Sequence, residues 1–565
     1  MTNKNINLWR VRLIQLLFLL FLFIIFFRII YLQVVLSKDL KKLADNQKRF
    51  STSTPVFRGE IIDRKGMTLA VDSIKFDVYI HPKNYNPSIE KEEKLAEILN
   101  INAFDLQKIA KRKYISRLVS GLDKKSAKQI NLLKIRGIEV HSRNYRIYPQ
   151  NKLASHILGF VNWSFSGDSG IENAFDRYLQ IAKDHRKQVI LRSDGLPVYH
   201  LSPYVPVINS SLGQVIELTI DSGIQYKTEN ILKKNVEIAQ PDKATVIIMD
   251  VKTGEILSWA NYPDFNPNEY SKYPLENMNN WSITQMYEPG STFKILTLAA
   301  ALEKKKIKED FKYLDKGKIK VNKTTIKNYN YKAGYEKELD LINILRHSSN
   351  TASAEIALSL GAENFYKELK KFDIGEKTGI ELQGESAGYL KDYNQWSQID
   401  LATTGFGQGV VAVTPIQLVT AVNAIANNGI LVKPHLIKAI KNADKRKIIK
   451  KTQIKSKRVI SKKTAKIMTT IMTESVKENL EDQSHLSGNI KNISVAGKTG
   501  TSQKFCKETG TYYPDQVITS FIGFFPAQKP KYLMLVVFDN PKIGRFGDTV
   551  AGPVFNEIGE FLTQN

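Results

Sequence analysis

A serine and a lysine three residues apart are the first candidates for chemistry in this sequence. Ser291 and Lys294 follow a Pro-Gly turn and precede the apolar segment 295–302, so we expect a helix that begins at Ser291. Residues three apart share a helix face, which lets the hydroxyl and the amine touch. A lysine whose pKa is depressed can take the proton of a serine nucleophile. The pair is a candidate nucleophile and base, although the polar stretch 88–91 has the same spacing.

The simpler interpretation of this pair is a capped helix. An acidic residue, however, suits the first turn of a helix better than Lys294 does, because the helix dipole is positive there. Helix stability alone therefore does not explain the lysine.

Two later motifs supply the other groups that such a site needs. Ser348 and Asn350 close a predicted helix at 339–347 and provide a hydroxyl and an amide. Lys-Thr-Gly occurs three times, but only the copy in Lys498–Thr501 lies on a predicted strand. The three motifs together indicate a nucleophile, a base, a hydroxyl relay and a strand that binds a carboxylate.

Length and composition bound the class of protein. A chain of 565 residues predicts two or three domains, and its net charge of +26 comes mostly from dispersed lysines. We expect a solvated basic face, with a specific anion site, anionic lipid or acidic wall polymer as alternatives. Nucleic acid is not predicted, because no nucleic-acid-binding motif is found. The single Cys506 excludes an intrachain disulfide, and the eight scattered histidines predict no metal and no cofactor.

The N-terminal region contains an apolar stretch, 13–36, that is long enough to cross a bilayer. Lys4, Arg10 and Arg12 precede it, which places the N-terminus in the cytoplasm and the rest of the chain outside. A cleaved signal peptide is the alternative, but no small-residue cleavage site follows the stretch.

The region between this stretch and residue 205 shows no convergent catalytic groups. We expect a polar stalk at 38–49, a strand–turn–strand at 58–70 and a helix at 170–179. Arg58, Asp63 and Arg64 are expected to pair between the strands.

The C-terminal region predicts a mixture of strands and helices. Strands at 493–501, 520–525 and 532–538 are expected in one antiparallel sheet, and 244–251 and 255–260 form a hairpin. The helical predictions are 415–429, a helix capped by Ser461 and a last helix at 550–561, and a lysine-rich hairpin is expected at 438–460.

The three motifs in this order resemble those of the penicilloyl serine transferases, the group of penicillin-binding proteins and serine β-lactamases. The similarity extends from Arg58 almost to the C-terminus and resembles the class B penicillin-binding proteins, which are monofunctional wall transpeptidases. The segments that carry it are 58–70, 146–159, 170–176, 244–263, 288–294, 405–418 and 498–501. Segments 348–350, 379–388 and 520–526 look more like the division (septal) branch, whereas 407–409 is closer to the elongation branch.

The resemblance implies a multidomain α+β fold with an antiparallel sheet flanked by helices, as in serine β-lactamases. The implied divisions are a cytoplasmic tail (1–12), a transmembrane anchor (13–36), a stalk and dimerisation-type pedestal (37–210) and a transpeptidase domain (211–565). It also implies a single-pass protein of the inner membrane, with the catalytic domain in the periplasm.

The resemblance further implies a mechanism. Ser291 would attack the penultimate D-Ala carbonyl of a stem peptide while Lys294 takes its proton, and Ser348 would protonate the leaving D-Ala. The backbone N–H groups of Ser291 and Thr501 would form the oxyanion hole. The implied catalytic residues are Ser291, Lys294, Ser348 and Lys498, and the implied substrate-binding residues are Asn350, Thr499, Gly500 and Thr501.

Partners also follow from the resemblance: peptidoglycan stem peptides, β-lactams, a membrane glycan polymerase and divisome proteins. The alternatives are an elongation-type transpeptidase, a non-catalytic divisome scaffold of the same fold, and a β-lactam-hydrolysing or sensing protein. The long module before the motifs disfavours the last of these. A bifunctional polymerase is disfavoured because no region of glycosyltransferase size precedes that module.

Overall fold

The computed structural model describes residues 8–37, 52–53, 57–180, 188–189, 213–329, 331–445, 447–481, 488–506 and 510–564. The chain divides into two units, Met1–Phe57 with Ile181–Ser211, and Arg58–Gln180 with Leu212–Asn565. The predicted stalk at 38–49 lies outside the described residues.

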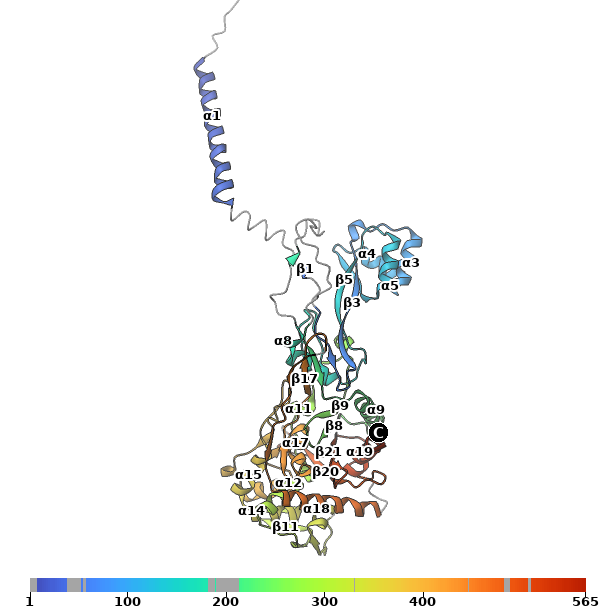
Figure 1. Cartoon of the computed structure of the whole chain (residues 1–565), viewed down its shortest axis with the longest axis vertical. Helices are drawn as coiled ribbons and strands as arrows, with labels where there is room; N and C mark the ends of the chain where they lie inside the picture. The colour runs from blue at the N-terminus through green and yellow to red at the C-terminus, as the bar shows by residue number, and fades with distance from the viewer. Residues whose placement is uncertain are drawn as a thin grey trace, which may run out of the picture. The chain divides into compact units, whose positions relative to one another are not determined.

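The first unit contains one long apolar helix (Figure 1). Helix α1 (Leu8–Ile30) continues into the π-helical turn η1 (Tyr31–Val35). The span Arg12–Val35 has 24 residues, and its most apolar 18-residue stretch has a mean hydropathy of 2.8 and is not buried by protein. Their length and composition suffice to cross a bilayer. The unit also holds the antiparallel pair β1 (Thr52–Ser53) and β6 (Gln188–Val189).

The second unit begins with a head in which three helices pack on three antiparallel strands (Figure 1). The strands are β3 (Thr68–Ile80), β4 (Ser116–Leu122) and β5 (Ile138–Ile147), with β3 in the middle. The helices are α3 (Ile89–Leu99), α4 (Ala103–Ala110) and α5 (Lys124–Leu133). Val78, Leu95, Leu106 and Ile130 form the centre of the apolar core of the head.

A second sheet segment connects the head to the C-terminal part of the unit. Strand β2 (Ile61–Ile62) pairs with β3 and runs parallel to β7 (Val215–Leu218). Strand β7 pairs with β17 (Ile437–Lys441), which pairs with β18 (Ile448–Lys451). The strand–turn–strand predicted at 58–70 is therefore confirmed, and it belongs to a larger sheet.

A buried cluster of ions lies beside this connection. Arg58 donates to Glu172 at 2.7 Å and to Asp176 at 2.6 Å. Arg146 donates to Glu172 at 2.6 Å and to Asp72 at 3.0 Å. All of these side chains except that of Asp176 are almost fully buried. Removal of one partner would leave an uncompensated buried charge, which is strongly destabilising.

The prediction that Arg58, Asp63 and Arg64 pair between the strands is wrong. Arg58 belongs to the ion cluster, whereas Asp63 accepts a hydrogen bond from the Ser222 hydroxyl at 2.7 Å. The Arg64 guanidinium lies 3.2 Å from Glu255. These charges are structural, but each has a partner more than a hundred residues away in the sequence. The contacts of Asp63 and Arg64 connect the base of the head to the C-terminal part of the unit.

The C-terminal part is built on an antiparallel sheet with the order β20-β21-β22-β8-β9. The strands are β8 (Lys243–Asp250), β9 (Ile256–Tyr262), β20 (Ala496–Cys506), β21 (Thr511–Phe525) and β22 (Tyr532–Asp539). The helices that pack around it include α9 (Ser222–Ala239), α12 (Lys294–Glu303), α17 (Pro415–Ala426), α18 (Lys462–Glu481) and α19 (Gly547–Gln564). The predicted antiparallel sheet is confirmed.

Alternate residues of the central strands pack on opposite faces of this sheet. Val246 and Val536 belong to the core beneath α9 and α19. Ile247 and Leu535 belong to the larger core that includes α12 and α17. Because successive strand residues point to opposite faces, the largely apolar central strands bury both faces of the sheet under helices (Figure 1).

The remaining elements surround these layers. They are η2 (Pro82–Asn84), α6 (Ser155–Leu158), α7 (Gly170–Ala174), α8 (Asp176–Leu179), η4 (Pro267–Lys272), α10 (Leu275–Met278), α11 (Trp281–Thr284), η5 (Gly290–Phe293), β10 (Lys312–Asp315), β11 (Lys318–Val321), β12 (Thr324–Lys327), β13 (Lys337–Asp340), α13 (Leu341–Arg346), α14 (Asn350–Leu360), α15 (Ala362–Lys371), β14 (Tyr389–Leu390), η6 (Tyr393–Gln395), α16 (Gln398–Thr404), β15 (Val411–Ala412), β16 (Ile430–Val432) and β19 (Ser456–Arg458).

Three local predictions need correction. The helix expected at 339–347 begins two residues later, because the preceding strand β13 pairs with β10. The helix expected at 170–179 is interrupted at Phe175, whose φ of −113° and ψ of 21° are not helical. In the hairpin expected at 438–460, β17 and β18 pair as predicted, but β19 pairs with β16 instead.

Candidate active site

The serine–lysine pair lies where the 3-10 turn η5 leads into α12. The helix expected to begin at Ser291 begins at Lys294. The simpler interpretation, a helix capped by Ser291, is wrong because Ser291 lies inside η5 and no side-chain cap forms. Its hydroxyl therefore contacts other side chains. The Lys294 Nζ atom lies 3.1 Å from Ser291 Oγ, which is hydrogen-bond distance.

The Lys294 amine is fully buried and surrounded by oxygen atoms. It donates to the Ser348 carbonyl at 2.6 Å, to Ser348 Oγ at 3.0 Å and to Asn350 Oδ1 at 2.8 Å. Burial lowers the pKa of Lys294 well below its ordinary value, and the nearby Lys498 ammonium lowers it further. The lowered pKa favours the neutral amine, and a neutral amine can accept the Ser291 proton.

Ser348 occupies the tight connection between α13 and α14. Its φ of +53° is left-handed, a conformation that few residues other than glycine adopt. Both its carbonyl and its hydroxyl reach Lys294, and the hydroxyl also donates to Ser291 Oγ at 2.8 Å. The three side chains form a closed triangle of hydrogen bonds, through which a proton can move between the nucleophile, the base and Ser348.

The third motif lies on strand β20 at the edge of the sheet. Lys498 is buried, and its amine donates to Thr499 Oγ1 at 3.1 Å. Burial lowers the pKa of Lys498 to about 8. The amide of Gly547, in the first turn of α19, donates to Thr501 Oγ1 at 3.3 Å. The strand thus presents a cation and hydroxyls next to a helix N-terminus, an arrangement suited to a carboxylate.

Two glycines let this strand approach the serine turn closely. A Cβ atom on Gly500 would lie 2.8 Å from Thr292 Cγ2, and one on Gly290 would lie 3.0 Å from the Thr501 carbonyl. Gly290 also has a φ of +57°, which favours glycine. The contact places the third motif directly against the turn that carries Ser291.

The structure distinguishes this Lys-Thr-Gly from the other two copies. Lys252 lies in the turn between β8 and β9 and donates to Asn427. Lys377 lies in the loop between α15 and β14, where Glu385 accepts from the Thr378 hydroxyl and amide. Both have structural surroundings and neither lies in the strand against η5.

Two family profiles match the chain. The Penicillin binding protein transpeptidase domain matches residues 244–560, and the Penicillin-binding Protein dimerisation domain matches residues 53–206. The chain is 34% identical over 540 residues to stage V sporulation protein D of Bacillus subtilis (strain 168), across 94% of this chain and 82% of that protein.

The chain belongs to the class B penicillin-binding proteins.

Other relatives of this penicillin-binding protein agree. It is 30% identical over 586 residues to the peptidoglycan D,D-transpeptidase FtsI homolog of Mesostigma viride, across 98% of this chain and 95% of that protein. It is 31% identical over 570 residues to peptidoglycan D,D-transpeptidase FtsI of Buchnera aphidicola subsp. Schizaphis graminum (strain Sg), across 97% of this chain and 94% of that protein. It shares its fold with Penicillin Binding Protein 2X from Streptococcus thermophilus, with a TM-score of 0.74, 22% identity and coverage of 91% of this chain and 80% of that one. The protein is a peptidoglycan D,D-transpeptidase with a penicillin-binding domain, which implies that it binds a peptide substrate and β-lactams.

One residue of this penicillin-binding protein's site has no motif in the sequence. Asp315, at the end of β10, is buried and accepts from Ser349 Oγ at 2.6 Å and from Thr351 Oγ1 at 2.8 Å. It also accepts from the Asn328 amide, whose oxygen in turn accepts from the Asn350 backbone N–H at 2.8 Å. Asp315 therefore positions the Ser348–Asn350 connection through Ser349, Thr351 and Asn328. In the sequence, Asp315 is recognisable only as an aspartate before a Lys-Gly pair. Aspartate is common in turns for structural reasons, so this position did not indicate a functional role.

Glu288 joins the serine turn to two neighbouring segments of the penicillin-binding protein. It accepts from the Gly409 N–H at 3.0 Å and from the Tyr512 hydroxyl at 3.0 Å. Burial raises the pKa of Glu288 to about 7. This side chain connects η5 to strand β21 and to the glycine-rich loop before β15.

Proposed function

We propose that this penicillin-binding protein cross-links stem peptides of peptidoglycan through an acyl-enzyme on Ser291 during septal wall synthesis. The observation that carries the proposal is the 3.1 Å separation between Ser291 Oγ and the Lys294 amine, whose pKa is lowered by burial and by Lys498. A buried amine with a lowered pKa at this distance can act as the base for the hydroxyl.

In the first step, Ser291 Oγ attacks the carbonyl carbon of the penultimate D-Ala while Lys294 accepts the hydroxyl proton. The C–N bond to the terminal D-Ala then breaks, and Ser348 passes a proton to the departing amine. In the second step, an amine of a neighbouring stem peptide attacks the ester carbonyl, which forms the cross-link and returns the proton to the Ser291 hydroxyl. β-Lactams acylate Ser291 because their strained amide takes the place of the peptide bond.

We assign substrate binding to the groups that surround this triangle. Asn350 holds the substrate amide, and Lys498, Thr499 and Thr501 hold the terminal carboxylate. Gly500 is part of this substrate-binding strand, because its lack of a side chain leaves room beside η5. The backbone N–H groups of Ser291 and Thr501 form the oxyanion hole that stabilises the developing negative charge.

We also propose that residues 13–36 anchor the protein in the inner membrane, after a cytoplasmic tail at 1–12. The stalk and pedestal (37–210) and the transpeptidase domain (211–565) then lie in the periplasm, where the substrate is. The apolar helix and the basic residues before it support this orientation. In this setting the partners are a membrane glycan polymerase and divisome proteins.

The septal role rests on the similarity of segments 348–350, 379–388 and 520–526 to the division branch, and 407–409 is closer to the elongation branch. A fluorescent fusion of the full chain should concentrate at the division site. A uniform signal along the side wall would assign the protein to elongation instead.

Labelling by a fluorescent penicillin tests the chemical part of the proposal. The purified full chain should form a covalent adduct that survives denaturation, and Ser291→Ala should abolish it. Ser359→Ala, which removes a hydroxyl from an exposed residue of α14, is the control and should label like the unmodified protein. Labelling that persists in Ser291→Ala would exclude Ser291 as the nucleophile. If Ser291→Ala restored growth of a strain depleted of this protein, the result would favour a non-catalytic scaffold role for the protein.

A further inference from the structure

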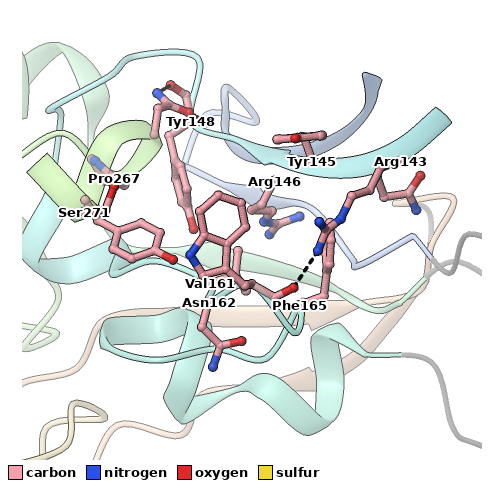
Figure 2. A pocket seen from close by; sticks show the side chains of 13 residues that line it. Arg143, Tyr145, Arg146, Tyr148, Val161, Asn162, Phe165, Pro267 and Ser271 are labelled. Carbon is pink, nitrogen blue, oxygen red and sulfur yellow. Dashed lines mark hydrogen bonds between the residues drawn. The ribbon is translucent and has the colours of Figure 1, made fainter. Parts of the chain in front are cut away.

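A pocket lies at the base of the head, away from the serine, lysine and strand motifs. Its volume is about 130 Å³, and it is bounded by the end of β5, the loop 161–165 and η4. Pro267 and Ser271 lie at one side of it and Arg143 and Phe165 at the opposite side (Figure 2). The mechanism proposed for Ser291 uses none of these residues.

An exposed tryptophan dominates the lining of the pocket. Trp163 is 55% exposed, although burial of an indole would be favourable. The Arg117 guanidinium lies over the indole, 5.2 Å from its centre, and Arg143 donates to the Trp163 carbonyl at 2.7 Å. The Arg143 guanidinium also lies 6.0 Å from the ring centre, and these contacts hold the indole at the surface of the pocket.

The pocket is aromatic, and Arg143 is the arginine of its lining that lies outside the buried ion cluster. Tyr148, Tyr270 and Phe165 add further rings, and Tyr270 stacks on Phe160. Arg143 and Arg146 line the pocket, whereas none of its thirteen lining residues, all of which the structure describes, is a carboxylate. The neighbouring Asp77 lies 4.0 Å from Arg143, whose side chain stays one-third exposed.

This combination of groups matches a sugar ring. One face of a pyranose consists of C–H groups and packs on an aromatic ring, while its rim carries oxygens that accept hydrogen bonds from guanidinium and amide donors. None of the lining residues is a carboxylate, so no fixed negative charge opposes the oxygens on the rim of a sugar. A peptide segment would also offer acceptors, but it would not need a flat, exposed platform.

We propose that this pocket binds a ring of the glycan strand, an N-acetylated hexosamine, and so holds the polymer while its stem peptides reach Ser291. The inference rests on the proposed function, because that function supplies the glycan. The platform is Trp163, and Arg143 and Asn162 are the donors at its rim.

Fluorescence anisotropy with the full chain in detergent micelles tests the inference. The probe is a labelled tetrasaccharide of β-1,4-linked N-acetylhexosamine without stem peptides. We expect saturable binding that Trp163→Ala weakens by about tenfold or more. Tyr226→Ala removes a ring that is 63% exposed on α9 and should leave the affinity unchanged.

Penicillin labelling of the same samples separates this inference from the proposed function. Trp163→Ala should label normally, because the ring lies outside the acylation site. Normal labelling with no binding of the tetrasaccharide, or with binding that Trp163→Ala does not weaken, would overturn the glycan site and leave the transpeptidase intact. Binding of an isolated stem peptide that depends on Trp163 would overturn it in favour of a peptide ligand.

Discussion

Replacement of Asp315 by Asn probes the support beneath the Ser348–Asn350 connection. The carboxylate accepts hydrogen bonds from four donor groups: the Gly317 N–H, the Ser349 and Thr351 hydroxyls and the Asn328 amide. An asparagine has the same shape, but one of its oxygens becomes an N–H₂ group that cannot accept. At least one buried donor therefore loses its acceptor, and the negative charge disappears.

The size of the effect follows from these contacts. A hydrogen bond to a charged group contributes about 1.5–3 kcal/mol, so the loss of one or two should lower the free energy of unfolding by about 2–5 kcal/mol. The Ser348 hydroxyl and carbonyl would lose their fixed positions around Lys294. Because small displacements of catalytic groups cost up to about a hundredfold in rate, we expect Asp315→Asn to slow acylation by about 10–100-fold.

The pH dependence distinguishes a positioning role from general destabilisation. Asp315 raises the pKa of Lys294, so its neutralisation should lower that pKa further. The neutral amine then persists to lower pH, and the acid limb of the acylation rate should move to lower pH. Loss of stability alone would leave the limb in place.

Time courses of labelling by fluorescent penicillin between pH 4 and pH 9, with urea unfolding of the same samples, measure both quantities. Asp310→Asn is the matched control, because this aspartate lies on the surface near the same hairpins. Acylation of Asp315→Asn at the unmodified rate, with an unshifted acid limb, would refute the positioning role.

Three further predictions address other parts of the molecule. Lys498→Gln removes the cation that lowers the pKa of Lys294, so the acid limb of the pH–rate profile for acylation by penicillin should move to higher pH. An acid limb at an unchanged pH would show that the two amines do not interact. Gly500→Ala places a methyl group 2.4 Å from a hydroxyl oxygen of β21, so unfolding measurements should show a loss of about 1–3 kcal/mol together with slower acylation. Arg146→Met leaves Glu172 without one of its buried partners, and urea unfolding should show a loss of about 3–5 kcal/mol while the folded fraction still labels; unchanged stability would argue against the ion cluster.

The chemical groups of the site could be predicted from the sequence because short motifs carry them. Ser291 and Lys294 lie at the start of an apolar helix, and the strand of Lys498 pairs with the apolar strand β21 at the edge of the sheet. Their order along the chain is uncommon enough to indicate a family. The structure brings Ser291, Lys294 and Ser348 into hydrogen-bond contact and places the strand of Lys498 against η5.

The parts that escaped prediction depend on long-range contacts. Asp315 lies in a short lysine-rich segment without periodicity, and its role emerges only when Ser349 and Asn328 fold against it. Arg58 has acidic neighbours close in sequence, yet it pairs with Glu172, 114 residues away. The 3-10 turn around Ser291 could not be told from a helix start, because the same Pro-Gly signal precedes both.

Peptide mapping by mass spectrometry tests most directly whether the buried lysine activates Ser291. The full chain is incubated with benzylpenicillin at pH 7, digested and sequenced across residues 288–294. We expect the penicilloyl group on Ser291, and no adduct in Lys294→Met, whose apolar side chain of similar length cannot take the proton. An adduct on another residue, or acylation of Lys294→Met at the unmodified rate, would contradict the mechanism.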